Sequence, residues 1–164
     1  MGLDCFMNGL TFRFADENDI EKILFFIKQL AEYEKMLDQV VATPQLLKEW
    51  IFDKKKAEVL FAVEDGKEIG FALFFHNFST FLGRVGIYLE DLYVCPEHRG
   101  KGYGKAILKK LAGIAVERRC GRLEWWCLDW NKPSIDFYLS LGAEQMKDWT
   151  TYRLAGQKLK ELAE

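Results

Sequence analysis

The chain has 164 residues and a mass of 19.1 kDa, a size that fits one domain. Hydrophobic residues make up 49% of it and charged residues 29%, a balance typical of a folded globular protein and not of a disordered one. The net charge of −2 provides no overall field for nucleic acid or an anionic membrane, so neither is expected as a partner.

The first predicted elements are a strand and two helices. Alternating residues predict a strand over Leu10–Phe14, and Asp16–Asp19 offers N-caps for a helix after it. That helix carries apolar residues at helical spacing: Ile20, Ile23, Leu24, Ile27, Leu30 and Ala31. A second helix begins at Thr43–Pro44, where an N-cap precedes a proline. We expect residues 1–9 to be loosely ordered and 1–164 to form a single domain.

A β-hairpin is predicted in the middle of the chain. The strands Val59–Val63 and Ile69–His76 flank Asp65–Gly66, a strong signal for a two-residue turn. A loop over Asn77–Gly83 follows, and Val85–Val94 is predicted as a long central strand. The hairpin and the central strand would form the middle of one sheet.

The C-terminal part is predicted to alternate between helices and strands. Helices are expected over Gly102–Arg118 and over Pro133–Leu141, the second ended by Gly142. Strands are expected over Arg122–Leu128 and about Thr151–Leu154, before a charged tail. The order of the predicted strands and helices along the chain indicates an α/β or α+β domain, in which helices flank both faces of a mixed sheet.

The four cysteines, Cys5, Cys95, Cys120 and Cys127, form no closely spaced pair, and the chain has only two histidines. We therefore expect no metal site and reduced thiols in the cytoplasm. No apolar run approaches the roughly 18 residues that cross a bilayer, and the N-terminus lacks a secretory pattern. None of the cysteines has a convincing activating partner for a covalent relay.

The most informative stretch, which we call the phosphate loop, joins the central strand to a predicted helix. Its residues are Arg99, Gly100, Lys101, Gly102, Tyr103, Gly104 and Lys105. Its amide N–H groups lack intrahelical acceptors and lie at the positive end of the helix dipole, which suits a pyrophosphate. The glycines let phosphate oxygens approach the backbone. The alternative is a glycine-rich connection without a ligand; the pattern is neither a Walker A nor a Rossmann motif.

Charge is unevenly distributed along the chain. Residues 96–122 contain eight Lys or Arg against two acids, a local charge of +6. Residues 16–53 contain nine acids against four lysines, a local charge of −5. This indicates a basic half for phosphates and an acidic half for something cationic, although two solvated helix faces would give the same pattern.

Three parts of the chain resemble the GCN5-related N-acetyltransferase (GNAT) superfamily. Arg99, Gly102 and Gly104 match the RxxGxG pattern of the loop that binds the acetyl-CoA pyrophosphate in that superfamily. The strand over 88–94 and the run from Asn131 to Tyr138 resemble two further parts of the same site. The resemblance covers about residues 10–155 and implies a mostly antiparallel, twisted sheet. Within the superfamily the chain is most similar to diamine (spermidine/spermine) and thialysine N-acetyltransferases, on the basis of Leu30–Glu34, Leu89–Asp91 and the run from Asn131 to Tyr138.

The resemblance implies acetyl-CoA as cosubstrate and no metal. Besides the phosphate loop, it implies cofactor contacts from Leu92, Tyr93, Val94, Asn131, Pro133, Ser134 and Tyr138. Backbone N–H groups from Leu92 to Val94 would bind the oxyanion and pair with the pantetheine arm. For Asn131 the alternative is simple capping of the next helix.

The catalytic residues implied are Glu90 and Tyr138. Because an alkylammonium has a pKa of about 10.4, a base must take its proton before it attacks a thioester. Glu90 would accept that proton through water, and Tyr138 would protonate the leaving sulfur. The alternatives are an exposed strand carboxylate for Glu90 and a core aromatic for Tyr138. On an ideal strand Asp91 would point to the face opposite Glu90, unless a bulge redirects it.

The resemblance implies that Tyr33, Glu34, Glu90 and Asp91 contact the amine. Phe81, Gly83 and Asp148–Thr150 depart from the polyamine enzymes where substrate selection is expected, so polyamine and lysine-like amines both stay open. We predict direct transfer in a ternary complex to a small primary amine. The alternatives are a non-catalytic CoA-binding regulatory module and a protein or peptide N-acetyltransferase. The 15% aromatic content and the resemblance also predict a homodimer.

Overall fold

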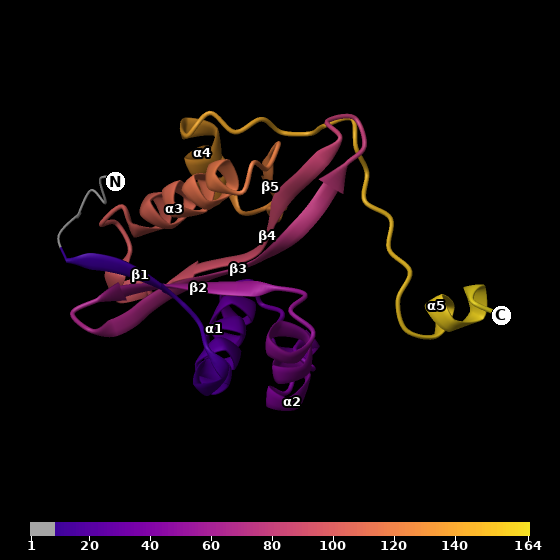
Figure 1. Cartoon of the computed structure of the whole chain (residues 1–164), viewed down its shortest axis with the longest axis horizontal. Coiled ribbons are helices and arrows are strands. Elements are labelled where there is room, and N and C mark those ends of the chain that lie inside the picture. The colour runs from indigo at the N-terminus through magenta and orange to yellow at the C-terminus, as the bar shows by residue number, and fades with distance from the viewer. Residues whose placement is uncertain (1–8) are drawn as a thin grey trace. The chain divides into compact units, whose positions relative to one another are not determined.

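The computed structural model describes residues 9–164, so the expectation of a loosely ordered N-terminus lies almost entirely outside the described residues (Figure 1). Its contacts divide the chain into two compact units. The first ends at Trp126, and the second comprises Cys127–Glu164. Each unit is described by itself.

The first unit is built on a five-stranded sheet whose strands follow one another in sequence order. Its strands are β1 (Leu10–Phe14), β2 (Glu58–Glu64), β3 (Lys67–Ser79), β4 (Arg84–Val94) and β5 (Leu123–Trp125). The pairs β1–β2, β2–β3 and β3–β4 are antiparallel, and β5 runs parallel to β4. The predicted mixed, mostly antiparallel sheet is confirmed.

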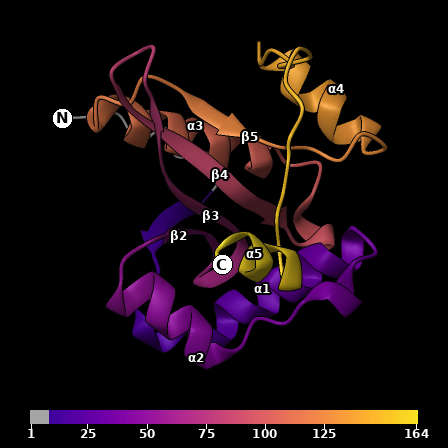
Figure 2. The same ribbon diagram turned by 90° about the vertical axis from the view of Figure 1, so that its right-hand side faces the viewer.

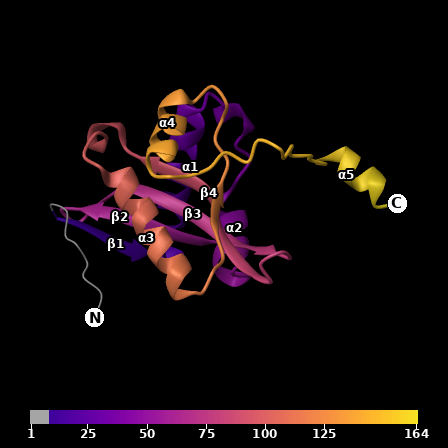
Figure 3. The same cartoon turned by 90° about the horizontal axis from the view of Figure 1, so that it is seen from above.

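Helices cover both faces of this sheet, as expected. Figures 1 and 2 show α1 (Ile20–Tyr33) and α2 (Pro44–Leu47) on one face; Figure 3 shows α3 (Tyr103–Glu117) on the other. Phe26 of α1 is fully buried, and its ring stacks on that of Phe71 in β3 with the ring centroids 5.2 Å apart. Burial of such side chains is the main force that holds the helices to the sheet.

Two irregularities in the strands matter for the site. Asp65 and Gly66 both have positive φ, 49° and 76°, as the two-residue turn between β2 and β3 requires. In β4, Asp91 pairs with Leu73 and Leu89 pairs with Phe74, so Glu90 is an extra residue without a partner on β3. Glu90 is therefore a β-bulge, and beyond it the side chains of β4 change faces.

The second unit contains two helices, α4 (Lys132–Ser140) and α5 (Gln157–Leu162). Asn131 caps α4 and a proline lies in its first turn, while Gly142 with φ of 85° follows its end. These are the start and stop signals that the sequence predicted. The sequence does not predict the short helix α5, because its charged residues are typical of a solvated tail.

Three predicted boundaries need correction. The loop expected over Asn77–Gly83 is shorter, because β3 continues to Ser79 and β4 starts at Arg84. The strand expected over Arg122–Leu128 is only β5, three residues long. The strand expected over Thr151–Leu154 is absent from the described structure; its residues are exposed. A strand forms only where a neighbour pairs with its backbone, and local alternation does not supply that neighbour.

Candidate active site

The phosphate loop has the backbone of an anion site. Gly100 and Gly102 adopt left-handed conformations, with φ of 77° and 84°, which residues with a Cβ rarely adopt. The helix α3 begins at Tyr103, and no side chain in the described part of the chain caps its N-terminus. The first N–H groups of α3 therefore remain available to an anion at the positive end of the helix dipole.

Arg99 links this loop to two other elements. Its Nε donates to the carbonyl oxygen of Val94, at 2.9 Å, and so ties the loop to the end of β4. Its guanidinium carbon lies 4.9 Å from the ring centroid of Tyr33 and 5.2 Å from that of Tyr93. Both are cation–π distances. Arg99 thus brings the predicted cofactor residues beside Tyr33, a predicted substrate residue at the end of α1.

Three side chains around the loop converge on a residue that sequence analysis missed, Glu64. Tyr103 donates its hydroxyl hydrogen to Glu64, the Nδ1 of His98 lies 2.7 Å from Glu64 Oε2, and the Nζ of Lys101 lies 3.5 Å away. These partners are more than 30 positions away in sequence, so no local pattern could have revealed the cluster.

Acidic side chains gather near the end of α1, where Glu34, Glu90 and Asp91 interact. The bulge at Glu90 puts Asp91 on the same face as the buried Tyr93, which packs under α1. Burial, followed by the charges of Glu90 and then Glu34, raises the pKa of Asp91 from 3.8 to about 7. Burial also raises the pKa of Glu34. The cluster is an arrangement that favours a bound cation.

One edge of β4 lies open beside this cluster. The strand β5 pairs with Ile87, Tyr88 and Leu89 only, and no strand among residues 9–164 pairs with that edge from Glu90 to Val94. An extended ligand that offers amide groups can bind such an edge as an added strand. Leu92, Tyr93 and Val94 lie in this stretch.

The remaining predicted residues belong to the second unit. Asn131 is buried, and its side-chain oxygen accepts a hydrogen bond from the Ser134 backbone N–H at 3.4 Å. Capping of α4 by Asn131 is therefore confirmed, and contact with a cofactor stays a prediction. Pro133 lies in the first turn of α4, and Tyr138 lies further along it, with its ring 5.4 Å from that of Phe137.

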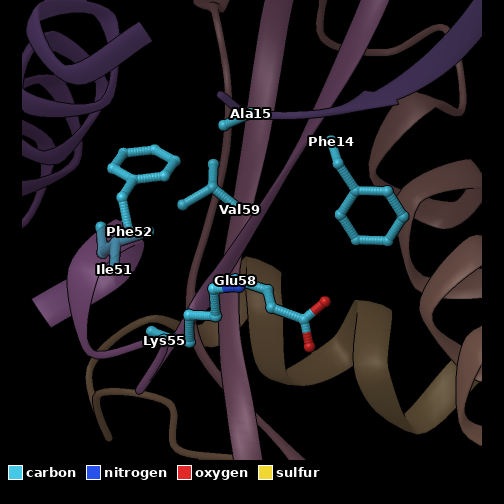
Figure 4. Close-up of a pocket in the computed structure, with 8 residues that line it drawn as sticks. Phe14, Ala15, Ile51, Phe52, Lys55, Glu58 and Val59 are labelled. Carbon is cyan, nitrogen blue, oxygen red and sulfur yellow. The ribbon is translucent and has the colours of Figure 1, made fainter. Parts of the chain in front are cut away.

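A surface pocket lies elsewhere in the first unit (Figure 4). It measures about 460 Å³, and its lining includes Phe14, Phe52, Lys55 and Glu58. Glu58 begins β2, whereas Glu64 at the other end of that strand contacts the phosphate loop. None of the predicted site residues lines this pocket, so we do not assign the reaction to it.

No group of three or more His, Cys, Asp or Glu side chains among residues 9–164 is placed to hold a metal ion. The described helices are also all too short or too polar to span a membrane.

The chain matches the model of the acetyltransferase (GNAT) family over residues 20–143. It is 39% identical to thialysine N-epsilon-acetyltransferase of Bos taurus, an alignment that covers 96% of this chain and 99% of that one. It is 42% identical to L-ornithine N5-acetyltransferase NATA1 of Arabidopsis thaliana, over 57% of this chain and 41% of that one. Among solved structures, an integron cassette protein of V. cholerae superimposes with a TM-score of 0.79 at 30% identity, over 94% of this chain and 98% of that one.

The fold and these matches define an acyltransferase of the GNAT type. The chain belongs to the acetyltransferase (GNAT) family, and it is an N-acetyltransferase. The family and the enzyme class predicted from the RxxGxG pattern are thus confirmed.

Proposed function

We propose that this protein transfers acetyl from acetyl-CoA to the terminal amine of a small lysine-like amino acid, with thialysine as the model substrate. The observation that carries this proposal is the acidic cluster of Glu34, Glu90 and Asp91, linked to the phosphate loop through Arg99 and Tyr33. The relatives that act on thialysine and ornithine favour an amino acid with a side-chain amine over a long polyamine.

The residues present fit acetyl-CoA, which supplies the acetyl thioester when it binds. The left-handed Gly100 and Gly102 and the uncapped N-terminus of α3 offer backbone N–H donors to its pyrophosphate. The net positive charge of residues 96–122 adds an electrostatic field that attracts the phosphates. We propose that Leu92–Val94 hold the amide-rich arm along the open edge of β4, and that Asn131, Pro133 and Ser134 contribute from the start of α4.

Within this proposal, Glu90 accepts the proton of the substrate ammonium through water. Glu90 is exposed at the bulge, so water reaches its carboxylate. Asp91 and Glu34 hold the positive charge of the amine before it loses its proton. A bound ammonium lowers the pKa of Asp91 again, because an opposite charge favours the ionised carboxylate. The amine therefore binds by relieving the repulsion among three carboxylates.

Tyr138 is proposed as the acid that donates a proton to the departing sulfur. The backbone N–H groups of Leu92–Val94 hold the negative charge that develops on the acetyl oxygen. Direct attack in a ternary complex is proposed, because burial raises the pKa of the Cys95 thiol and so disfavours the thiolate that a covalent relay needs.

We further propose that both units form one catalytic domain, since the family match runs from 20 to 143 and includes parts of each. We also propose a cytoplasmic homodimer. The free thiols of Cys95 and Cys120 fit a reducing compartment, and exposed aromatic side chains fit an interface. Light scattering should give twice 19.1 kDa; a mass near 19.1 kDa would contradict the dimer.

The function is tested by incubating the pure protein with acetyl-CoA and a panel of amines while thiol release is followed. The panel contains thialysine, lysine, ornithine, spermidine and a histone-tail peptide. We expect the highest kcat/KM with thialysine or ornithine. A preference for spermidine or for the peptide would contradict the proposed lysine-like substrate. CoA binding without turnover on any amine would favour a regulatory module.

A further inference from the structure

Glu64 and its contacts with other side chains have no role in the reaction as proposed above. Glu64 is the last residue of β2, directly before the Asp65–Gly66 turn. Although it lies at the surface end of a hairpin, only 14% of its side chain is exposed. Both of its carboxylate oxygens are engaged: Oε1 accepts from the hydroxyl of Tyr103, and Oε2 faces His98 and Lys101.

These partners lie on both sides of the segment that binds the anion. His98 ends a short 3₁₀ turn before the loop, and Tyr103 is the first residue of α3 and only 4% exposed. Between them lie four residues, two of which are the left-handed Gly100 and Gly102. One carboxylate therefore contacts residues at both ends of the glycine-containing segment of the site. Glycine has the largest conformational freedom to lose on ordering, so pinning lowers the entropy cost of binding.

We infer that Glu64 is a positioning residue for the cosubstrate: it holds the phosphate loop in the conformation that binds the pyrophosphate, and it does not touch the ligand itself. This inference rests on the proposed use of acetyl-CoA. In keeping with the contact, the hydroxyl of Tyr103, followed by His98 and Lys101, holds the pKa of Glu64 below its usual value. Glu64 stays ionised at neutral pH and keeps its partners in place.

The sign of the effect separates positioning from plain electrostatics. A carboxylate beside a polyanion site repels the ligand, so its removal should tighten binding of CoA if charge alone mattered. If Glu64 positions the loop, its removal weakens binding in spite of the lost repulsion. Asp65 offers a matched control: it is adjacent in the same turn, its charge acts on Tyr103, and asparagine also tolerates its φ of 49°.

The experiment compares CoA binding by calorimetry in the full chain and in Glu64→Ala, Glu64→Gln and Asp65→Asn. We expect binding about tenfold weaker for Glu64→Ala, which corresponds to about 1.4 kcal/mol. For Glu64→Gln we expect about threefold weaker binding, because the amide oxygen still accepts from Tyr103. Asp65→Asn should bind as tightly as the unsubstituted protein or slightly more tightly. In turnover assays, Glu64→Gln should raise the KM for acetyl-CoA and leave kcat and the KM for the amine unchanged.

Equal or tighter CoA binding in both Glu64 variants would overturn the inference, and so would an equal loss in Asp65→Asn. If Glu64→Ala does not fold, Glu64→Gln decides the question. A second readout does not depend on CoA: the Ala106 amide, which donates to the Gly102 carbonyl at 3.0 Å, should exchange hydrogen faster in Glu64→Gln. If the unsubstituted protein binds no CoA, the proposed function fails, whereas this exchange still tests the pinning of the loop.

Discussion

Asp91→Asn should make the protein more stable at neutral pH while it impairs the reaction. The carboxyl of Asp91 is mostly buried beside Glu90 and Glu34, and its pKa is raised from 3.8 to about 7. In the unfolded chain the same carboxyl ionises near its usual pKa. Between these values the folded protein binds more protons than the unfolded one, so stability falls as the pH rises. Above about pH 7 the full penalty is present.

The size of the effect follows from that difference. At 1.36 kcal/mol per pH unit, the interval from 3.8 to about 7 corresponds to about 4 kcal/mol. Because Asp91 keeps partial contact with water, this is an upper limit, and we expect the substitution to add about 2–4 kcal/mol above about pH 7. At about pH 4 the carboxyl is largely neutral in the folded protein, and the two proteins should differ little.

The assay is urea unfolding of both proteins at about pH 4, 6 and 8, with the difference in unfolding free energy as the readout. In this difference, the contributions of most groups that titrate in both proteins cancel. Glu144→Gln serves as the control, because Glu144 is exposed and its charge does not act on Asp91, so this substitution should change stability by less than about 0.5 kcal/mol at each pH. A stability gain that does not grow with pH, or a loss at about pH 8, would refute the reasoning. We also expect kcat/KM for thialysine to fall at least about tenfold.

Two further predictions concern the loop and the acid. Gly102→Ala places a Cβ at φ of 84° and should cost about 1–2 kcal/mol of stability and weaken CoA binding, as measured by urea unfolding and calorimetry. Gly113→Ala, in the middle of α3 with open space around it, should instead stabilise the protein by about 0.5–1 kcal/mol; equal losses in both variants would contradict the role of the left-handed backbone. Tyr138→Phe should lower kcat about 10²-fold, with a much smaller change in the KM for acetyl-CoA; an unchanged kcat would make Tyr138 a packing residue.

Features that depend on neighbouring residues could be predicted from the sequence alone. The Asp65–Gly66 turn, the spacing of apolar residues in α1 and α3, and the glycine pattern of the phosphate loop all express local backbone preferences. Because these preferences act over a few positions, they are readable without the fold. The family followed from the same short patterns.

Features that depend on pairing between distant segments could not be predicted. The bulge at Glu90 exists because β4 meets β3 with one residue too many, and that mismatch turns Asp91 toward Glu34. The cluster on Glu64 joins three segments that the chain order keeps apart. The expected strand over Thr151–Leu154 failed for the same reason, since alternation makes a strand possible and only a partner makes it form. The sequence by itself therefore determined the elements and the anion loop, and its family resemblance already grouped Glu34, Glu90 and Asp91. The tertiary structure decided which face Asp91 takes and that Glu64 contacts the loop, because both depend on pairing between distant segments.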